Sequence, residues 1–185
     1  MLQENEITVC VKTFMRDNIP GVGCVVERLV RSIRQWYPNI HISVADDSTL
    51  EVIQRRSAEL WPRFDNLKVI NLPYDSGVGA GRNAAIRNAS TKYCVVVDDD
   101  MIFVQDTDLL FLLESLLEQE FDMIAGIVHT DGGHTPYEGS LDVIDGVMLQ
   151  LPVMYTGEIH QCDIVHNFLL SRRKTFLKNP WAPEL

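Results

Sequence analysis

Short apolar runs alternate along most of the chain with longer segments in which apolar positions recur every three or four residues. The short runs predict strands at residues 7–12, 41–45, 67–72, 93–97 and 123–128. The longer segments predict helices at residues 22–36, 50–60, 79–89 and 107–119. Alternation of strands and helices predicts an α/β fold, with a doubly wound, mostly parallel sheet covered by helices on both faces.

This rhythm ends after residue 128. Residues 129–136 are rich in Gly, Thr and His and predict a loop, and strand-like pieces follow at 143–149 and 164–171. Strands without intervening helices predict a mixed or antiparallel second half. A length of 185 residues fits one domain. We therefore expect a single domain over 1–185, with a Rossmann-like nucleotide-binding half at 1–105 and a second half at 106–185.

Three consecutive carboxylates, Asp98, Asp99 and Asp100, directly follow the predicted strand at 93–97. Adjacent carboxylates repel one another and resist desolvation, so a strand end that carries three of them needs an offsetting charge. A divalent cation that prefers oxygen ligands, Mg²⁺ or Mn²⁺, is the usual solution. Ligands collect at the carboxyl ends of strands in open α/β sheets. The run therefore predicts a metal site that holds a phosphorylated ligand.

Polar segments also follow the first three predicted strands, at residues 12–16, 46–48 and 75–83. The carboxyl ends of parallel strands share one edge of a sheet, so we expect these segments to meet the acidic run there. The Gly-rich stretch within 75–83 does not have the spacing of a dinucleotide-binding fingerprint. Arg82 lies near the start of a predicted helix, where the dipole disfavours a cation unless an anion is close. Such an arginine suits a diphosphate or a carboxylate of the metal site.

The segment 46–48 has two readings. Ser48 or the following Thr49 fits the N-cap of the next predicted helix. Alternatively, the Asp47 carboxylate accepts a hydrogen bond from the imide N–H of a uracil base. The two readings are compatible, with Asp47 contacting the base and Ser48 capping the helix.

Composition narrows the function classes. The net charge of −10 argues against a nucleic-acid partner, because the chain has no basic stripe to neutralise a phosphate backbone. No apolar run approaches the ~18 residues of a membrane span. The four cysteines do not have the paired spacing of zinc ligands, and the sequence leaves open whether two of them form a disulfide. His129 and His134 flank Asp131, but their spacing and the lack of a clear third ligand do not support zinc.

Several motifs together resemble family 2 glycosyltransferases with the GT-A fold, and most closely the β-1,4-N-acetylgalactosaminyltransferases. They are Lys-Thr-Phe-x-Arg at 12–16, Ser-Ile-Arg-x-x-Tyr-Pro at 32–38, Ala-Asp-Asp-Ser at 45–48, Gly-x-Gly-Arg-Asn-x-Ala at 79–85 and Thr-Lys-Tyr-x-x-x-x-Asp-Asp-Asp at 91–100. Residues 165–170 look like a late strand of the same group. The motifs occur in the family's order and span nearly the whole chain.

The resemblance implies a metal-dependent, inverting transferase that moves an N-acetylhexosamine or hexose from a UDP-sugar to a hydroxyl of an oligosaccharide or glycoconjugate acceptor. Residues 106–185 would then face the acceptor. It implies that Thr13 and Asp47 hold the nucleoside, Arg82 secures the nucleotide end and Asp98 faces the ribose. Asp100, with Asp98, would ligate Mn²⁺ or Mg²⁺. The nucleotide-sugar site implied by the resemblance further includes Phe14, Arg16, Asp46, Gly81 and Asp99.

The resemblance leaves the catalytic base unassigned. In the resembling enzymes a Glu or Asp base follows the segment that matches 179–185, so we expect it past Leu185 and the acceptor-side half to be incomplete. Asp131, Asp163 and Glu184 fit turn or surface positions better. The resembling family includes cytosolic bacterial and Golgi-lumenal enzymes, which leaves the compartment open.

Two alternatives remain. A nucleotidyltransferase would carry a Gly-rich loop after the first strand, which residues 12–16 lack. A non-catalytic domain that binds a nucleotide-sugar without transferring it is the second.

Overall fold

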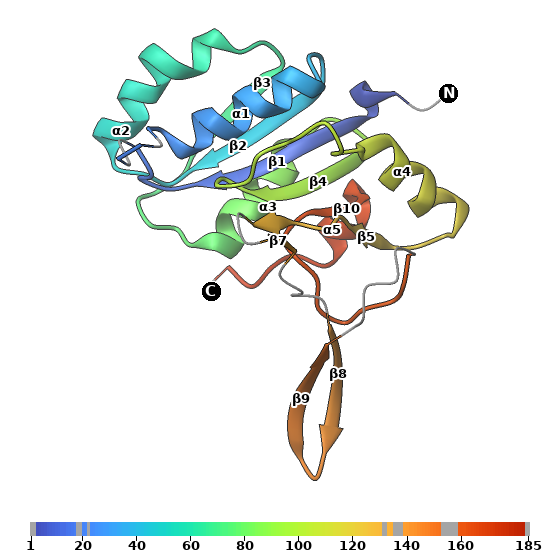
Figure 1. Ribbon diagram of the computed structural model, residues 1–185. Helices are drawn as coiled ribbons and strands as arrows, with labels where there is room; N and C mark the ends of the chain where they lie inside the picture. The colour runs from blue at the N-terminus through green and yellow to red at the C-terminus, as the bar shows by residue number, and fades with distance from the viewer. Residues whose placement is uncertain are drawn as a thin grey trace.

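The computed structural model describes residues 3–17, 20–21, 23–130, 133–134, 139–152 and 159–183. Its centre is a six-stranded sheet with the order β3-β2-β1-β4-β10-β5 (Figure 1). These strands are β1 (Ile7–Thr13), β2 (His41–Asp46), β3 (Leu67–Asn71), β4 (Tyr93–Asp98), β5 (Met123–Ala125) and β10 (Leu169–Arg172). Strands β1 to β4 pair in parallel, and β10 runs antiparallel between β4 and β5. The predicted mostly parallel sheet with a mixed second half is therefore confirmed.

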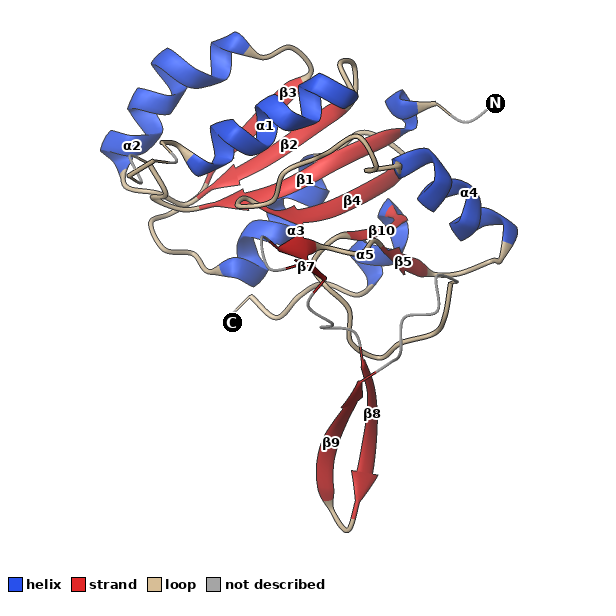
Figure 2. Ribbon diagram, in the orientation of Figure 1, coloured by secondary structure: helices blue, strands red, loops and turns tan. Residues whose placement is uncertain are grey.

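Helices cover both faces of this sheet (Figure 2). They are α1 (Val25–Trp36), α2 (Leu50–Arg55), α3 (Val78–Asn88), α4 (Leu109–Glu118) and α5 (Arg173–Lys178), with a short 3₁₀ turn, η1 (Glu4–Glu6), before β1. Helix α2 continues into a π-helical turn, η2 (Arg56–Leu60), and a 3₁₀ turn, η3 (Trp61–Arg63). Helix α4 begins later than predicted because the Asp108 carboxylate caps it by accepting from the N–H groups of Leu110 and Phe111. Among the described residues, no helix has the length and hydropathy to cross a bilayer.

The core lies on both faces of the sheet because successive strand side chains point to opposite sides. Val9 and Val11 of β1 pack with α1 and α4 side chains such as Leu29 and Leu113. Cys10 faces the other way and packs in a second cluster with side chains of α3 and α5. Burial on both faces explains why the central strands are continuous apolar runs in the sequence.

The second half differs from the sequence prediction at several points. The predicted strand at 143–149 is wrong: a turn at Asp145–Gly146 divides it between β8 (Gly139–Ile144) and β9 (Val147–Pro152). Both turn residues have positive φ, 52° and 79°, as a two-residue hairpin turn requires. The hairpin extends away from the sheet (Figure 1).

Three further predictions for the second half differ from the structure in their bounds. The predicted loop at 129–136 contains the paired short strands β6 (His129–Thr130) and β7 (Gly133–His134). The predicted strand at 123–128 stops at Ala125. From the predicted strand at 164–171, Ile164 forms an isolated bridge to Gly139 and pairing resumes at Leu169.

The segment after α5 returns to pack on α3. The Asn83 side chain donates to the Trp181 carbonyl at 2.8 Å and accepts from the Trp181 N–H at 3.0 Å. The Trp181 ring stacks on Phe176 with centroids 5.5 Å apart. At Gly79 a Cβ atom would lie 2.0 Å from the Ala182 carbonyl oxygen, so only glycine allows this approach.

We predict that Gly79→Ala displaces residues 179–183 from α3. Loss of the paired Asn83–Trp181 hydrogen bonds should lower the free energy of unfolding by about 1–3 kcal/mol. Urea unfolding measures this loss, and trypsin cleavage at Lys178 should become faster. The control Ala80→Gly costs about 1 kcal/mol of helix propensity but should leave Lys178 protected. Unchanged cleavage in Gly79→Ala would show that the glycine is not needed for docking.

Candidate functional site

The four polar segments meet at one edge of the sheet, as the sequence predicts. The parallel register places Thr13 beside Asp46, Asp46 beside Asn71, and Lys12 beside Asp98. Each of these residues lies at or next to the carboxyl end of its strand. The acidic run is therefore surrounded by the segments that follow the other strands.

The three carboxylates of the acidic run have different surroundings. Asp99 is buried and accepts a hydrogen bond from the Thr13 hydroxyl at 2.8 Å. It also forms an ion pair with Arg16 at 3.1 Å. The same Arg16 guanidinium lies 2.8 Å from Asp100, whose side chain is 55% exposed. Asp98 accepts from Arg82 at 2.6 Å and from the Asn167 amide at 3.0 Å. Two arginines thus neutralise much of the charge.

Desolvation dominates the electrostatics of Asp99. Burial raises the pKa of this carboxyl above its ordinary value, although the Thr13 hydrogen bond and the Arg16 charge act in the opposite direction. The same contacts raise the pKa of Arg16, through its hydrogen bond to Asp100 and the charge of Asp99. Arg16 therefore stays charged and is the cation that pairs with both Asp99 and Asp100.

Asp100 is the carboxylate that best fits a metal ligand. One of its oxygens contacts Arg16, and the exposed side chain leaves the other accessible. Asp98 fits less well, because both of its oxygens are engaged by Arg82 and Asn167. In the part of the chain that the structure describes, no three His, Cys, Asp or Glu side chains form a metal cluster. A cation at Asp100 would therefore need oxygen ligands from a bound phosphate.

A second cluster surrounds Asp47, which is fully buried. One carboxylate oxygen accepts from the Gly77 N–H at 3.2 Å. The Lys12 ammonium forms an ion pair with the other, Oδ1, at 3.0 Å, and no other group hydrogen-bonds to that oxygen among the described residues. Lys12 also lies 4.8 Å from the centroid of the Phe14 ring, which contacts Tyr74 at a centroid distance of 5.6 Å.

Gly81 makes room for Lys12. A Cβ atom at Gly81 would lie 2.2 Å from Lys12 Cγ, so a larger residue there would push the lysine away from Asp47. Gly81, predicted as a site residue, thus contributes through the space that it leaves rather than through a polar group.

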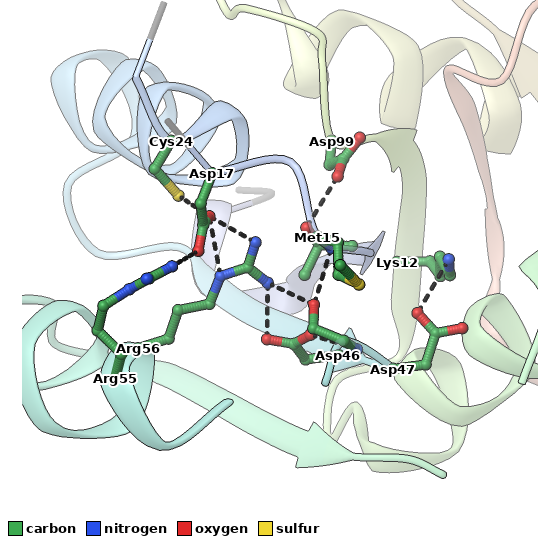
Figure 3. A network of polar contacts seen from close by, with 11 residues as sticks. Lys12, Met15, Asp17, Cys24, Asp46, Asp47, Arg55, Arg56 and Asp99 are labelled. Carbon is green, nitrogen blue, oxygen red and sulfur yellow. Dashed lines mark hydrogen bonds and ion pairs between the residues drawn. The ribbon is translucent and has the colours of Figure 1, made fainter. Parts of the chain in front are cut away.

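Asp46 faces the interior instead of the cluster around Asp47 (Figure 3). Its Oδ2 accepts from Arg56 at 2.7 Å and its Oδ1 from the Ser48 N–H at 3.0 Å. Of the two residues predicted as the N-cap of the helix, Thr49 is confirmed and Ser48 is not. Thr49 occupies the N-cap of α2 without a side-chain hydrogen bond, and the Ser48 hydroxyl instead accepts from the Met15 N–H at 2.9 Å.

Sequence reasoning missed the roles of Lys12, Asp17, Arg56 and Tyr74, all of which contact predicted site residues or their neighbours. Helical spacing offered one usable signal, since Arg56 lies three residues after Ile53 and four before Leu60 and therefore shares their buried face. Of the carboxylates weighed as a base, Asp163 accepts from the Leu141 N–H at 2.8 Å at the foot of the hairpin. Asp131 and Glu184 lie outside the described residues.

Comparison with protein families gives one match that covers most of the chain. The family described as Glycosyl transferase family 2 matches residues 8–176. Beta-1,4 N-acetylgalactosaminyltransferase 2 of Mus musculus is 35% identical over 124 residues, which are 67% of this chain and 22% of that protein. Beta-1,4 N-acetylgalactosaminyltransferase 1 of Homo sapiens is 32% identical over 141 residues, 76% of this chain and 24% of that protein. The chain thus spans about a quarter of the length of these relatives.

Solved structures confirm the fold. S. aureus TarS 1-349, crystallised in complex with UDP, superposes with a TM-score of 0.60 at 18% identity, covering 97% of this chain and 51% of that one. The same protein in complex with UDP-GlcNAc gives a TM-score of 0.59 at 17% identity, covering 94% and 47%. The fold is therefore GT-A, as the motifs predicted.

We predict that Arg16→Met destabilises the fold by about 1 kcal/mol at pH 7, a modest value because Arg16 is half exposed. Its loss should raise the pKa of Asp99 further. A carboxyl whose folded pKa exceeds its unfolded value of about 3.9 destabilises the folded state at neutral pH, and this penalty disappears as the pH falls below that value. The deficit of the variant should therefore shrink between pH 7 and pH 4.

Urea midpoints at pH 7, 5.5 and 4 measure this effect. Arg31→Met is the control, because Arg31 pairs with Glu27 on an exposed face of α1. That variant should stay within about 0.5 kcal/mol of the parent. A deficit in Arg16→Met that is constant with pH would contradict the role given to Asp99.

Proposed function

The chain belongs to glycosyl transferase family 2, and from this we propose that it binds a UDP-sugar and transfers the sugar to a hydroxyl group of a saccharide acceptor. The observation that carries the proposal is the meeting of Asp47, Arg82 and the acidic run at one carboxyl edge of a parallel sheet. The relatives named as N-acetylgalactosaminyltransferases, and the UDP-GlcNAc complex of TarS, favour an N-acetylhexosamine donor.

The nucleoside would bind between Asp47 and the aromatic pair. The Asp47 carboxylate would accept the imide N–H of uracil at Oδ1, the buried oxygen whose one partner among the described residues is the Lys12 ammonium. Phe14 and Tyr74 offer ring faces beside it. Thr13 is buried and donates its hydroxyl to Asp99, so it would support the site through that carboxylate. Asp47 has no exposed surface, so the Lys12 side chain would have to move before the base could reach it.

The diphosphate would lie between Arg82 and Asp100. Arg82 is held by Asp98 and by the Trp181 ring, 5.7 Å from its guanidinium carbon, and is therefore pre-positioned to contact an anion. Asp98, 37% exposed, would face the ribose. When bound at Asp100, Mn²⁺ or Mg²⁺ would offset the negative charge that develops on the leaving nucleoside diphosphate.

The proposed reaction is a direct displacement with inversion. The acceptor oxygen forms a bond to the anomeric carbon while the bond from that carbon to the phosphate oxygen breaks. Its electron pair leaves with UDP, and the acceptor proton passes to a carboxylate base. The residues at the carboxyl edge supply binding and orientation for this step.

Binding of UDP is the first test. Calorimetric titration should show binding that strengthens with Mn²⁺, and Asp100→Ala should remove the metal dependence while the far-UV CD spectrum is kept, because the substitution relieves a like-charge cluster. Asp106→Ala, an exposed carboxylate in the loop after β4, is the matched control and should retain the metal dependence. An affinity unaffected by Mn²⁺ in the parent protein would refute the metal proposal.

Release of UDP from UDP-N-acetylhexosamine in the presence of saccharide acceptors is the second test. Proton NMR of the product should show the opposite anomeric configuration from the donor. Binding without release, across a panel of acceptors, would favour a domain that holds a nucleotide-sugar without transferring it.

A further inference from the structure

Arg56 is a fully charged side chain in the interior, with 2% of its surface exposed. It begins the π-helical turn η2, at the point where α2 loses its regular hydrogen-bond pattern. Single π-helical turns within helices recur at functional positions. The irregularity and the buried charge together raise the question of what Arg56 holds in place.

The Arg56 guanidinium bridges two carboxylates from different strand-end segments (Figure 3). Nη1 donates to Asp46 Oδ2 at 2.7 Å, and Nη2 donates to Asp17 Oδ1 at 2.7 Å. Asp17 is also bound by Arg55 and by the Cys24 thiol, at 2.9 Å. Burial disfavours the Asp17 carboxylate, but these hydrogen bonds outweigh it and its pKa lies below the ordinary value.

The same network also reaches the backbone of residues 12–16, the segment after β1 that lies at the proposed UDP-sugar site. Arg56 Nη1 donates to the Ser48 hydroxyl at 3.2 Å, and that hydroxyl accepts from the Met15 N–H at 2.9 Å. Met15 has φ of +38°, a conformation that side-chain-bearing residues rarely adopt. A strained residue of this kind persists where its surroundings hold it.

Arg16 lies between the two fixed points, Met15 and Asp17. Its guanidinium is the group that pairs with Asp99 and Asp100. The backbone on either side of Arg16 is thus tied to Arg56, on one side through Ser48 and on the other through the Asp17 side chain.

Stability alone does not account for this arrangement. Buried ion pairs are costly to desolvate, and replacing them with apolar residues is often neutral or favourable. This network instead ties residues 15–17, which follow β1, to Asp46 and Ser48 at the end of β2, and so favours one conformation of residues 15–17.

We propose that Arg56 is a positioning residue of the donor site: with Asp17, Asp46 and Ser48 it clamps residues 15–17 so that Arg16 is held over the acidic run. The proposal rests on the proposed function for its consequence, the binding of UDP. The other part of the proposal, that the clamp fixes residues 15–17, does not depend on a bound ligand.

Two variants test the clamp. Ser48→Ala removes the link to the Met15 N–H and leaves the ion pairs in place. Arg56→Lys keeps the charge but loses the fork that spans both carboxylates. Arg34→Lys is the control, because Arg34 is a half-buried arginine that binds the backbone carbonyls of Tyr37, Ile40 and Asp65 away from the strand-end segments.

Hydrogen exchange of the backbone amides at 15–17 reports on the clamp directly. Exchange there should become faster in Ser48→Ala and Arg56→Lys and stay unchanged in Arg34→Lys. UDP affinity with Mn²⁺ should fall about tenfold in both clamp variants, the effect of about one hydrogen bond, and stay unchanged in the control.

A double-mutant cycle separates positioning from general destabilisation. If the clamp acts through Arg16, Ser48→Ala should cost little further UDP affinity in an Arg16→Met background. Additive losses, unchanged exchange in both clamp variants, or an equal loss of affinity in Arg34→Lys would each overturn the proposal. A parent protein that does not bind UDP would refute the proposed function instead, and the exchange experiment would still decide whether the clamp fixes the loop.

Discussion

Neutralisation of carboxylates at the strand ends is the constraint on which the rest of the structure depends. Five aspartates, Asp46, Asp47, Asp98, Asp99 and Asp100, lie at or just beyond the carboxyl ends of β2 and β4. Each pairs with a cation: Asp46 with Arg56, Asp47 with Lys12, Asp98 with Arg82, and Asp99 and Asp100 both with Arg16. These partners come from separate elements, so the fold as a whole assembles the charge balance.

The parallel sheet makes this concentration of charge possible. Its strands β1, β2 and β4 are buried on both faces and hold their ends in fixed register, so that loops distant in sequence meet. Within this sheet edge the aspartates differ in burial and in what their carboxylates contact. Asp46 is used internally to hold the backbone, while Asp98 and Asp100 keep partial exposure and remain accessible to a ligand. Arg82, which pairs with Asp98, is the arginine that we propose contacts the diphosphate.

Much of this could be predicted from the sequence, because the relevant signals are local. Apolar runs ending in polar segments located the strands and the carboxyl edge, and the pairing of Arg82 with a carboxylate followed from helix-dipole reasoning. The partners of Asp46 could not be predicted in this way. Arg56 reaches Asp46 and Asp17 through a π-helical turn, and no local pattern predicts such a turn. The Asp145–Gly146 turn was a readable hairpin signal that strand periodicity obscured.

In the complex that we propose, this carboxyl edge holds UDP with the base at Asp47 and the phosphates between Arg82 and Asp100. A crystal structure of the protein soaked with UDP and Mn²⁺ tests it most directly. We expect uracil within hydrogen-bond distance of Asp47, with Lys12 displaced, and an ion between Asp100 and the phosphate oxygens. Density for UDP elsewhere, or a Lys12–Asp47 pair left intact beside bound UDP, would contradict it.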